Sequence, residues 1–142
     1  MFIFEKDNAL SSENCERLIT LFEELKGFQH PGETIGGLNT NIKDCTEILF
    51  SPEHSELDFL LEALQSGLDE YQKRYPFLKK LSTFGQIENI SFKRYYPGQA
   101  YHELHCERSI IKTCARMLVW MFYLWGGCRP HIPRFLFVQF VG

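Results

Sequence analysis

The chain has 142 residues, 44% of them apolar and 15% aromatic, a composition typical of one globular domain with a bulky core. Its formal charge of −3 gives no basic signature, so nucleic-acid binding is not indicated. Five cysteines without a Cys-x-x-Cys pair argue against a disulfide framework or a cysteine-rich zinc module, and they favour a reducing cytoplasm. The first residues are charged too early for a signal peptide, and no apolar run is long enough to span a membrane.

The N-terminal part of the chain predicts helices that support a sheet. In two segments the apolar residues recur three and four positions apart, each segment starts at a serine cap, and a Gly or Pro ends it. The expected elements in chain order are a strand at 2–4, a helix at 12–27, a loop at 29–43, a strand at 46–50 and a helix at 51–76.

From residue 86 onward the apolar period changes to two, which is typical of strands. We expect strands at 87–95, 101–107 and 116–124, with a turn at 96–99. Helices first and strands later favour an α+β fold in which helices cover one face of a mostly antiparallel sheet.

His105 and Glu107 are the residues most indicative of chemistry. On a strand, residues two apart share a face, so the imidazole and carboxylate point into one cavity while Cys106 faces away. They supply two corners of the 2-His-1-carboxylate arrangement that binds non-haem Fe(II). In isolation the pair reads more simply as a strand histidine and an exposed acid. A zinc pair with His102 is disfavoured, since alternation places His102 opposite His105.

Three segments in this order resemble a known family. They are Phe92 to Tyr101 with its Tyr-Pro-Gly turn, then His105-Cys106-Glu107, then the arginine-led apolar run Arg116 to Leu124. The chain resembles the Fe(II)- and 2-oxoglutarate-dependent dioxygenases of prolyl-4-hydroxylase-like type. That resemblance implies a double-stranded β-helix of jelly-roll or cupin type in a single domain, 1–142. Its parts are a helical support region at 1–84, core strands at 85–124 and a divergent tail at 125–142.

The resemblance also implies site residues and a reaction. His105 and Glu107 are expected to ligate iron, with Glu standing where the family has Asp. Tyr96, Tyr101 and Tyr123 are expected to line the co-substrate pocket, and no catalytic residue is assigned beyond the metal ligands. The implied reaction uses O2 to decarboxylate 2-oxoglutarate to succinate and to hydroxylate a peptidyl substrate, prolyl side chains being the best-known target, or a small molecule. Ascorbate is an expected accessory reductant.

The family pattern stops after Leu124. A distal histidine and a basic residue for the far carboxylate of 2-oxoglutarate are expected several tens of residues later, and only His131 and Arg134 are available. We predict a truncated or frame-shifted reading from about residue 125, with low activity and exposed strand edges through which the chain oligomerises. The alternative is a non-catalytic remnant or binding domain of the same fold. A zinc-binding interaction module drawing on Cys106, Cys114, Cys128 and His131 fits no recognised spacing.

Overall fold

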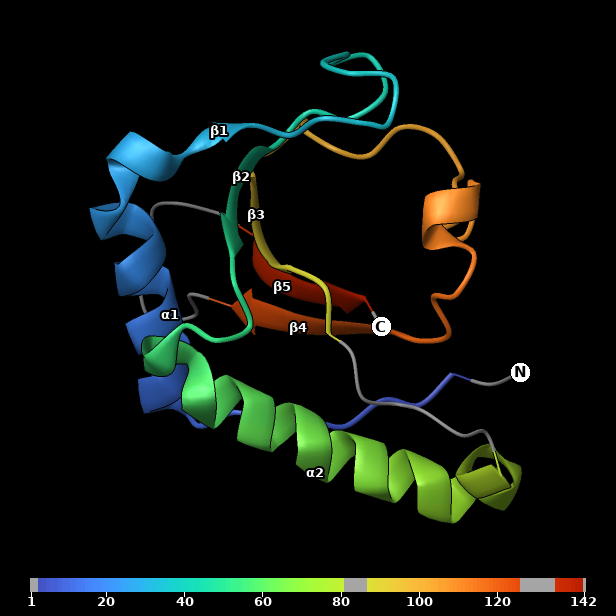
Figure 1. Cartoon of the computed structure of the whole chain (residues 1–142). Helices are drawn as coiled ribbons and strands as arrows, with labels where there is room; N and C mark the ends of the chain where they lie inside the picture. The colour runs from blue at the N-terminus through green and yellow to red at the C-terminus, as the bar shows by residue number, and fades with distance from the viewer. Residues whose placement is uncertain (1–2, 81–86, 126–134, 142) are drawn as a thin grey trace.

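The structure, a computed structural model, describes residues 3–80, 87–125 and 135–141 of the chain (Figure 1). The described helices and strands are, in chain order, α1 (Ser12–Glu24), η1 (Lys26–Phe28), β1 (His30–Pro31), β2 (Thr46–Phe50), η2 (Ser55–Leu57), α2 (Asp58–Arg74), η3 (Pro76–Lys80), β3 (Ile90–Tyr95), η4 (Ile111–Thr113), β4 (Val119–Trp125) and β5 (Phe135–Val141). The α+β class expected from the sequence is confirmed. Within these ranges, no helix is long and apolar enough to cross a membrane.

The described strands form one five-stranded antiparallel sheet in the order β1-β2-β3-β5-β4. Its longest pairing joins β4 to β5, from Val119 opposite Val141 to Trp125 opposite Phe135. On its other side β5 pairs with β3, where Ser91 lies opposite Gln139. The last described segment of the chain is therefore inserted between two earlier strands, and β4 is left at the edge of this sheet.

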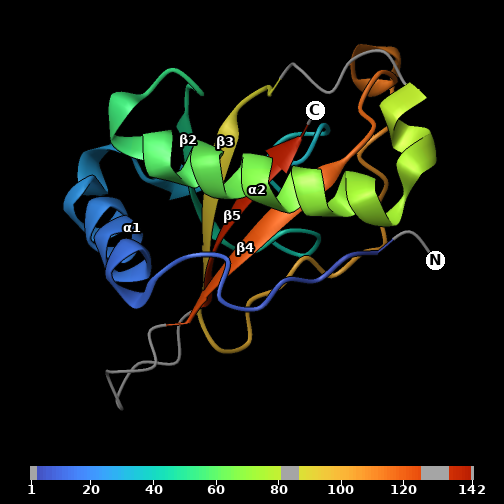
Figure 2. The same cartoon turned by 90° about the horizontal axis from the view of Figure 1, so that it is seen from below.

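The two α-helices lie on the same side of the sheet (Figures 1 and 2). Their apolar stripes meet alternate residues of the strands in one core, in which Leu18, Phe22, Leu60, Ile90 and Phe92 have no exposed surface. Burying a side chain of this size contributes roughly 2 kcal/mol to folding. Since neighbouring residues on a strand point to opposite faces, the odd-numbered residues of β2 and β3 lie on the face away from the helices.

The first helix follows its sequence signals closely. Ser11 is the N-cap, and its hydroxyl accepts a hydrogen bond from the backbone N–H of Asn14 at 3.1 Å. The second helix begins later than expected, at Asp58 instead of near residue 51. The reason is a local turn, because the hydroxyl and carbonyl of Ser51 accept the backbone N–H groups of Glu53 (3.3 Å) and His54 (3.1 Å).

Two expected strands are absent from the described residues. Ile3 and Phe4 are irregular, although the Phe4 ring lies 6.0 Å from that of Tyr71 on α2. In the expected strand at 101–107 only Tyr101 forms a bridge, to Lys43, and the rest is irregular. The apolar residues that alternate with polar ones here, Leu104 and Cys106, are both exposed, so this segment buries no face against the sheet.

The strand β5 was not foreseen, because the sequence analysis assigned no element to the tail. Its sequence, FLFVQFV, is apolar at both even and odd positions. Such a run is typical of a strand covered on both faces. The short strand β1 was likewise read as part of a loop.

Candidate functional site

His105 and Glu107 lie in the irregular segment that connects β3 to β4. Their side chains turn toward each other, with His105 Nε2 at 3.5 Å from Glu107 Oε1. The His105 side chain is 45% exposed and that of Glu107 25%. The strand expected here is absent, yet a nitrogen and an oxygen donor meet at a place that solvent reaches.

His105 is held by its neighbours. Its ring stacks on Tyr101, with 3.9 Å between ring centroids and 16° between ring planes. Its Nδ1 lies 3.4 Å from the carbonyl oxygen of Glu103, an acceptor for the proton in the tautomer that carries it on Nδ1. That tautomer leaves the lone pair of Nε2 on the side of Glu107, which is the form in which a histidine binds metal.

Glu107 is held by Arg116, which precedes β4. Arg116 Nη1 donates to Glu107 Oε2 at 3.1 Å and to the Glu107 carbonyl oxygen at 3.2 Å. The rest of the guanidinium forms a fork with Glu88, in which Nε and Nη2 donate to the two carboxylate oxygens at 2.8 and 2.6 Å. These bonds lower the pKa of Glu88 and raise that of Arg116. Both groups therefore remain charged at neutral pH.

The spacing of the two donors fits a shared metal ion. Donors about 2.1 Å from one ion stand about 3.0 Å apart at a right angle and about 3.4 Å apart at the tetrahedral angle. The observed 3.5 Å needs little adjustment. Among the described residues, no third His, Cys, Asp or Glu completes a metal-binding group with them. The part of the chain that the structure describes thus offers two protein ligands for a metal ion at this place.

The three tyrosines expected around a co-substrate occupy different surroundings. Tyr101 contacts His105, as described above, whereas the Tyr96 ring lies 4.9 Å from the Arg94 guanidinium. Tyr123 is 69% exposed and its hydroxyl lies 3.4 Å from Met121 Sδ. The described contacts bring only Tyr101 to the histidine, and the assignment of the other two to a co-substrate pocket stays a prediction. His131 and Arg134 lie outside the described residues.

The sheet face away from the helices carries a buried group of charged residues that the sequence analysis missed. Glu47 on β2 accepts hydrogen bonds from Lys43 Nζ at 2.7 Å through Oε2 and from the Ser91 hydroxyl through Oε1. Lys93 Nζ lies 3.9 Å from the same Oε1. The side chains of Lys43, Glu47 and Lys93 are 7%, 8% and 13% exposed. The pairing register of β2 with β3 would have predicted this group, since it places Glu47 directly opposite Lys93.

Neighbouring charges and burial shift the pKa values of Glu47 and Lys93 in opposite directions. Burial raises the pKa of Glu47, but the charge of Lys93 and the bonds from Lys43 and Ser91 outweigh it, so the pKa is lowered. Burial lowers the pKa of Lys93, an effect that Glu47 and, to a smaller extent, Glu107 oppose. Glu107 therefore acts electrostatically on the sheet as well as on its own loop.

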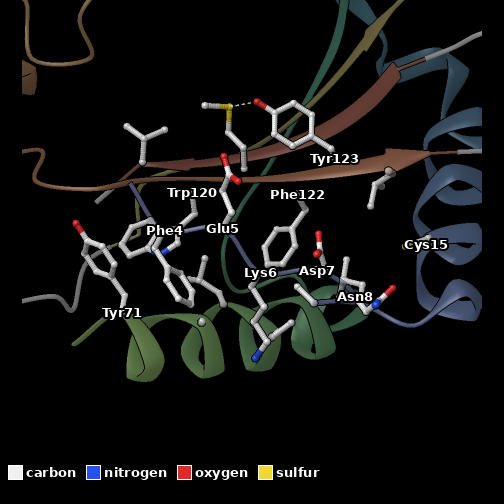
Figure 3. Close-up of a pocket in the computed structure, with 18 of the residues that line it drawn as sticks. Phe4, Glu5, Lys6, Asp7, Asn8, Cys15, Tyr71, Trp120, Phe122 and Tyr123 are labelled. Atoms are coloured by element: carbon white, nitrogen blue, oxygen red, sulfur yellow. Dashed lines mark hydrogen bonds between the residues drawn. The ribbon is translucent and has the colours of Figure 1, made fainter. Parts of the chain in front are cut away.

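A separate cavity of about 1050 Å³ lies between α2, β4 and residues 3–10 (Figure 3). Trp120 and Phe122 point into it toward α2, while Tyr123 points to the other side of β4. Lys6, whose ammonium pairs with Glu70, is among its lining residues. Apart from Leu118, which immediately precedes β4, the lining of the cavity includes no residue of the connection from β3 to β4, so it is distinct from the pair His105 and Glu107.

Comparison of the chain with known protein families, with curated proteins and with solved structures finds no match.

Proposed function

We propose that this chain is an oxidoreductase of the Fe(II)- and 2-oxoglutarate-dependent dioxygenase type. One observation carries the proposal: His105 Nε2 and Glu107 Oε1 lie 3.5 Å apart, a separation that suits two ligands of one metal ion. The order of the Tyr-Pro-Gly turn, the His-x-Glu pair and the arginine-led strand supports it. The fold proposed with this function is a double-stranded β-helix, of which the antiparallel sheet with its helical support is a part.

Each residue of the pair has a defined task in this proposal. His105 offers Nε2 while its Nδ1 proton faces the Glu103 carbonyl, and Glu107 offers Oε1. Tyr101 forms a wall against the imidazole. Iron, when bound together with 2-oxoglutarate and O2, supplies the oxidising chemistry that couples succinate formation to hydroxylation of a peptidyl, including prolyl, or small-molecule substrate.

We expect slow turnover from this chain. Because the described residues supply two ligands instead of three, iron is held less firmly and dissociates more readily. The measurement is succinate release from 2-oxoglutarate with Fe(II) and ascorbate present. His105→Ala should abolish whatever release occurs, whereas His102→Ala, at an exposed histidine three positions earlier, should not. Release that is unaffected by His105→Ala would refute the proposal.

A second function, that of a non-catalytic binding domain of the same fold, is favoured by the exposed apolar surface. Leu104, Ile111 and Tyr123 are 106%, 91% and 69% exposed, and β4 forms an edge of the described sheet. Large exposed apolar side chains and an open strand edge are each typical of a surface that a partner covers, including a second copy of the chain. Sedimentation of the purified chain tests this, because an unchanged monomer at high concentration speaks against self-association.

We propose a reducing compartment, the cytoplasm, as the location. Cys15, Cys45, Cys106 and Cys114 are all free thiols in the described residues. Exposed free thiols such as those of Cys106 and Cys114 persist where glutathione keeps cysteines reduced.

A further inference from the structure

Arg116 joins three parts of the chain that are distant in sequence. Its guanidinium binds Glu88, just before β3, and Glu107 in the connecting segment, while its backbone leads into β4. The side chain is 21% exposed, so these bonds are only partly screened by water. The guanidinium therefore fixes where the Glu107 carboxylate stands relative to both strands.

We propose that Arg116 is a positioning residue of the metal site: by holding Glu107 Oε2, it presents Oε1 to the ion that Glu107 shares with His105. This inference rests on the metal site of the proposed function. It concerns the different partners of the two oxygens of the Glu107 carboxylate. Oε2 lies 3.1 Å from Arg116 Nη1, and Oε1 lies 3.5 Å from His105 Nε2.

The arrangement matches how metal ligands are supported in proteins. A carboxylate that ligates a metal through one oxygen is typically held in place by a hydrogen bond to its other oxygen. Loss of this hydrogen-bond partner typically weakens metal binding about 10- to 100-fold. A lone guanidinium so close would repel a cation. Here Glu88 binds the same guanidinium through two bonds and neutralises it.

The role requires arginine because one side chain must serve two carboxylates at once. Guanidinium presents five N–H donors in a flat fork, of which Nε and Nη2 face Glu88 while Nη1 faces Glu107. A lysine has one nitrogen, so it can pair with either carboxylate but does not hold both in this geometry. Arg116→Lys should therefore bind metal with an affinity between those of the unaltered chain and Arg116→Gln.

The competing reading is that Arg116 only clips the connecting segment to the sheet. In that case its loss lowers stability and leaves metal coordination unchanged. Coordination is visible directly with Co(II), whose visible absorption depends on the number and geometry of its ligands. The intensity and position of this band form a readout that a purely structural role does not move.

The experiment titrates the full chain with Co(II) under anaerobic conditions and records affinity and spectrum together. The variants are Arg116→Gln, Arg116→Lys and Glu88→Gln, with Lys112→Gln as the matched control that removes a positive charge from the same segment. We expect Arg116→Gln to weaken binding about 10- to 100-fold and to change the band, and Lys112→Gln to do neither. Denaturation curves establish that each variant is folded.

The outcomes separate the inference from the function beneath it. An unchanged affinity and spectrum in folded Arg116→Gln overturns the positioning role while the metal site stands. If Arg116→Gln does not fold, Arg116→Lys decides by the same criteria, since it keeps the positive charge and removes the fork that holds Glu88 and Glu107 together. If the unaltered chain gives no band that His105→Ala removes, both the metal site and the role of Arg116 are refuted.

Discussion

Replacing Glu47 by Gln should strongly destabilise the fold. The substitution keeps the shape of the side chain and removes the negative charge that lies between Lys43 and Lys93. All three side chains are at most 13% exposed, so water does little to compensate the loss. Two buried ammonium groups would then face an amide in place of a carboxylate.

The size of the effect follows from this burial. Removing one partner of a buried ion pair typically costs about 3–5 kcal/mol, because the remaining charge is left uncompensated. The amide oxygen of Gln can still accept from Lys43 or Ser91, so we expect the lower end, about 3 kcal/mol. At roughly 3 °C per kcal/mol for a domain of this size, the melting temperature should fall by about 10 °C.

The loss should depend on pH in one direction. The pKa of Glu47 is lowered in the folded chain from its ordinary value of 4.5, so its charge stabilises the fold fully above that value. This stabilisation is lost as the pH falls through the lowered folded-state pKa. The difference in unfolding free energy between the unaltered chain and Glu47→Gln should thus be constant near neutrality and shrink below about pH 4.5.

Urea denaturation followed by circular dichroism measures this difference. Glu53→Gln is the matched control, since it makes the same chemical change at an exposed position. It should alter the unfolding free energy by less than about 0.5 kcal/mol. If Glu47→Gln costs no more than Glu53→Gln, the buried charges on this face of the sheet do not hold each other as described.

Three further predictions concern packing. Gly32→Ala should destabilise by about 1–3 kcal/mol because its Cβ would overlap the sulfur of buried Cys45. In urea denaturation Gly27→Ala, whose added Cβ meets no atom within 4 Å, should be close to neutral, and equal effects would contradict the packing. Leu60→Ala should cost about 2–5 kcal/mol by the same measurement, since Leu60 has no exposed surface, and a loss below 1 kcal/mol would place it outside the core. Tyr101→Leu should shift the ring proton resonances of His105 in NMR spectra by removing the stacked ring, and an unchanged spectrum would show that the rings are apart in solution.

The sequence predicted the elements whose signals are local. A serine cap and the apolar spacing located α1, and the strand expected at 46–50 is β2 as the structure has it. The start of α2 was wrong by several residues, because a serine before a proline caps a turn as readily as a helix. Such choices depend on bonds between neighbours that composition does not distinguish.

What sequence reasoning missed depends on contacts between distant segments. The strand at 135–141 pairs with β3 and β4, and nothing in its neighbours along the chain specifies that position. The hydrogen bonds of Arg116 with Glu88 likewise join residues 28 positions apart. His105 and Glu107 do face each other, but through a bend in an irregular segment instead of the strand alternation from which their proximity was inferred.

Glu107 connects the two charged groups of the molecule, and this limits what can replace it. It accepts from Arg116, and its charge also helps to keep the buried ammonium of Lys93 protonated. A neutral residue at this position would remove one possible metal ligand, leave Arg116 with Glu88 alone, and make the charge of Lys93 costlier to bury. The carboxylate is thus favoured by the stability of the sheet as well as by the site. Aspartate, with a side chain one methylene shorter, would keep the charge but would not reach both Arg116 and the neighbourhood of His105 from the same backbone position.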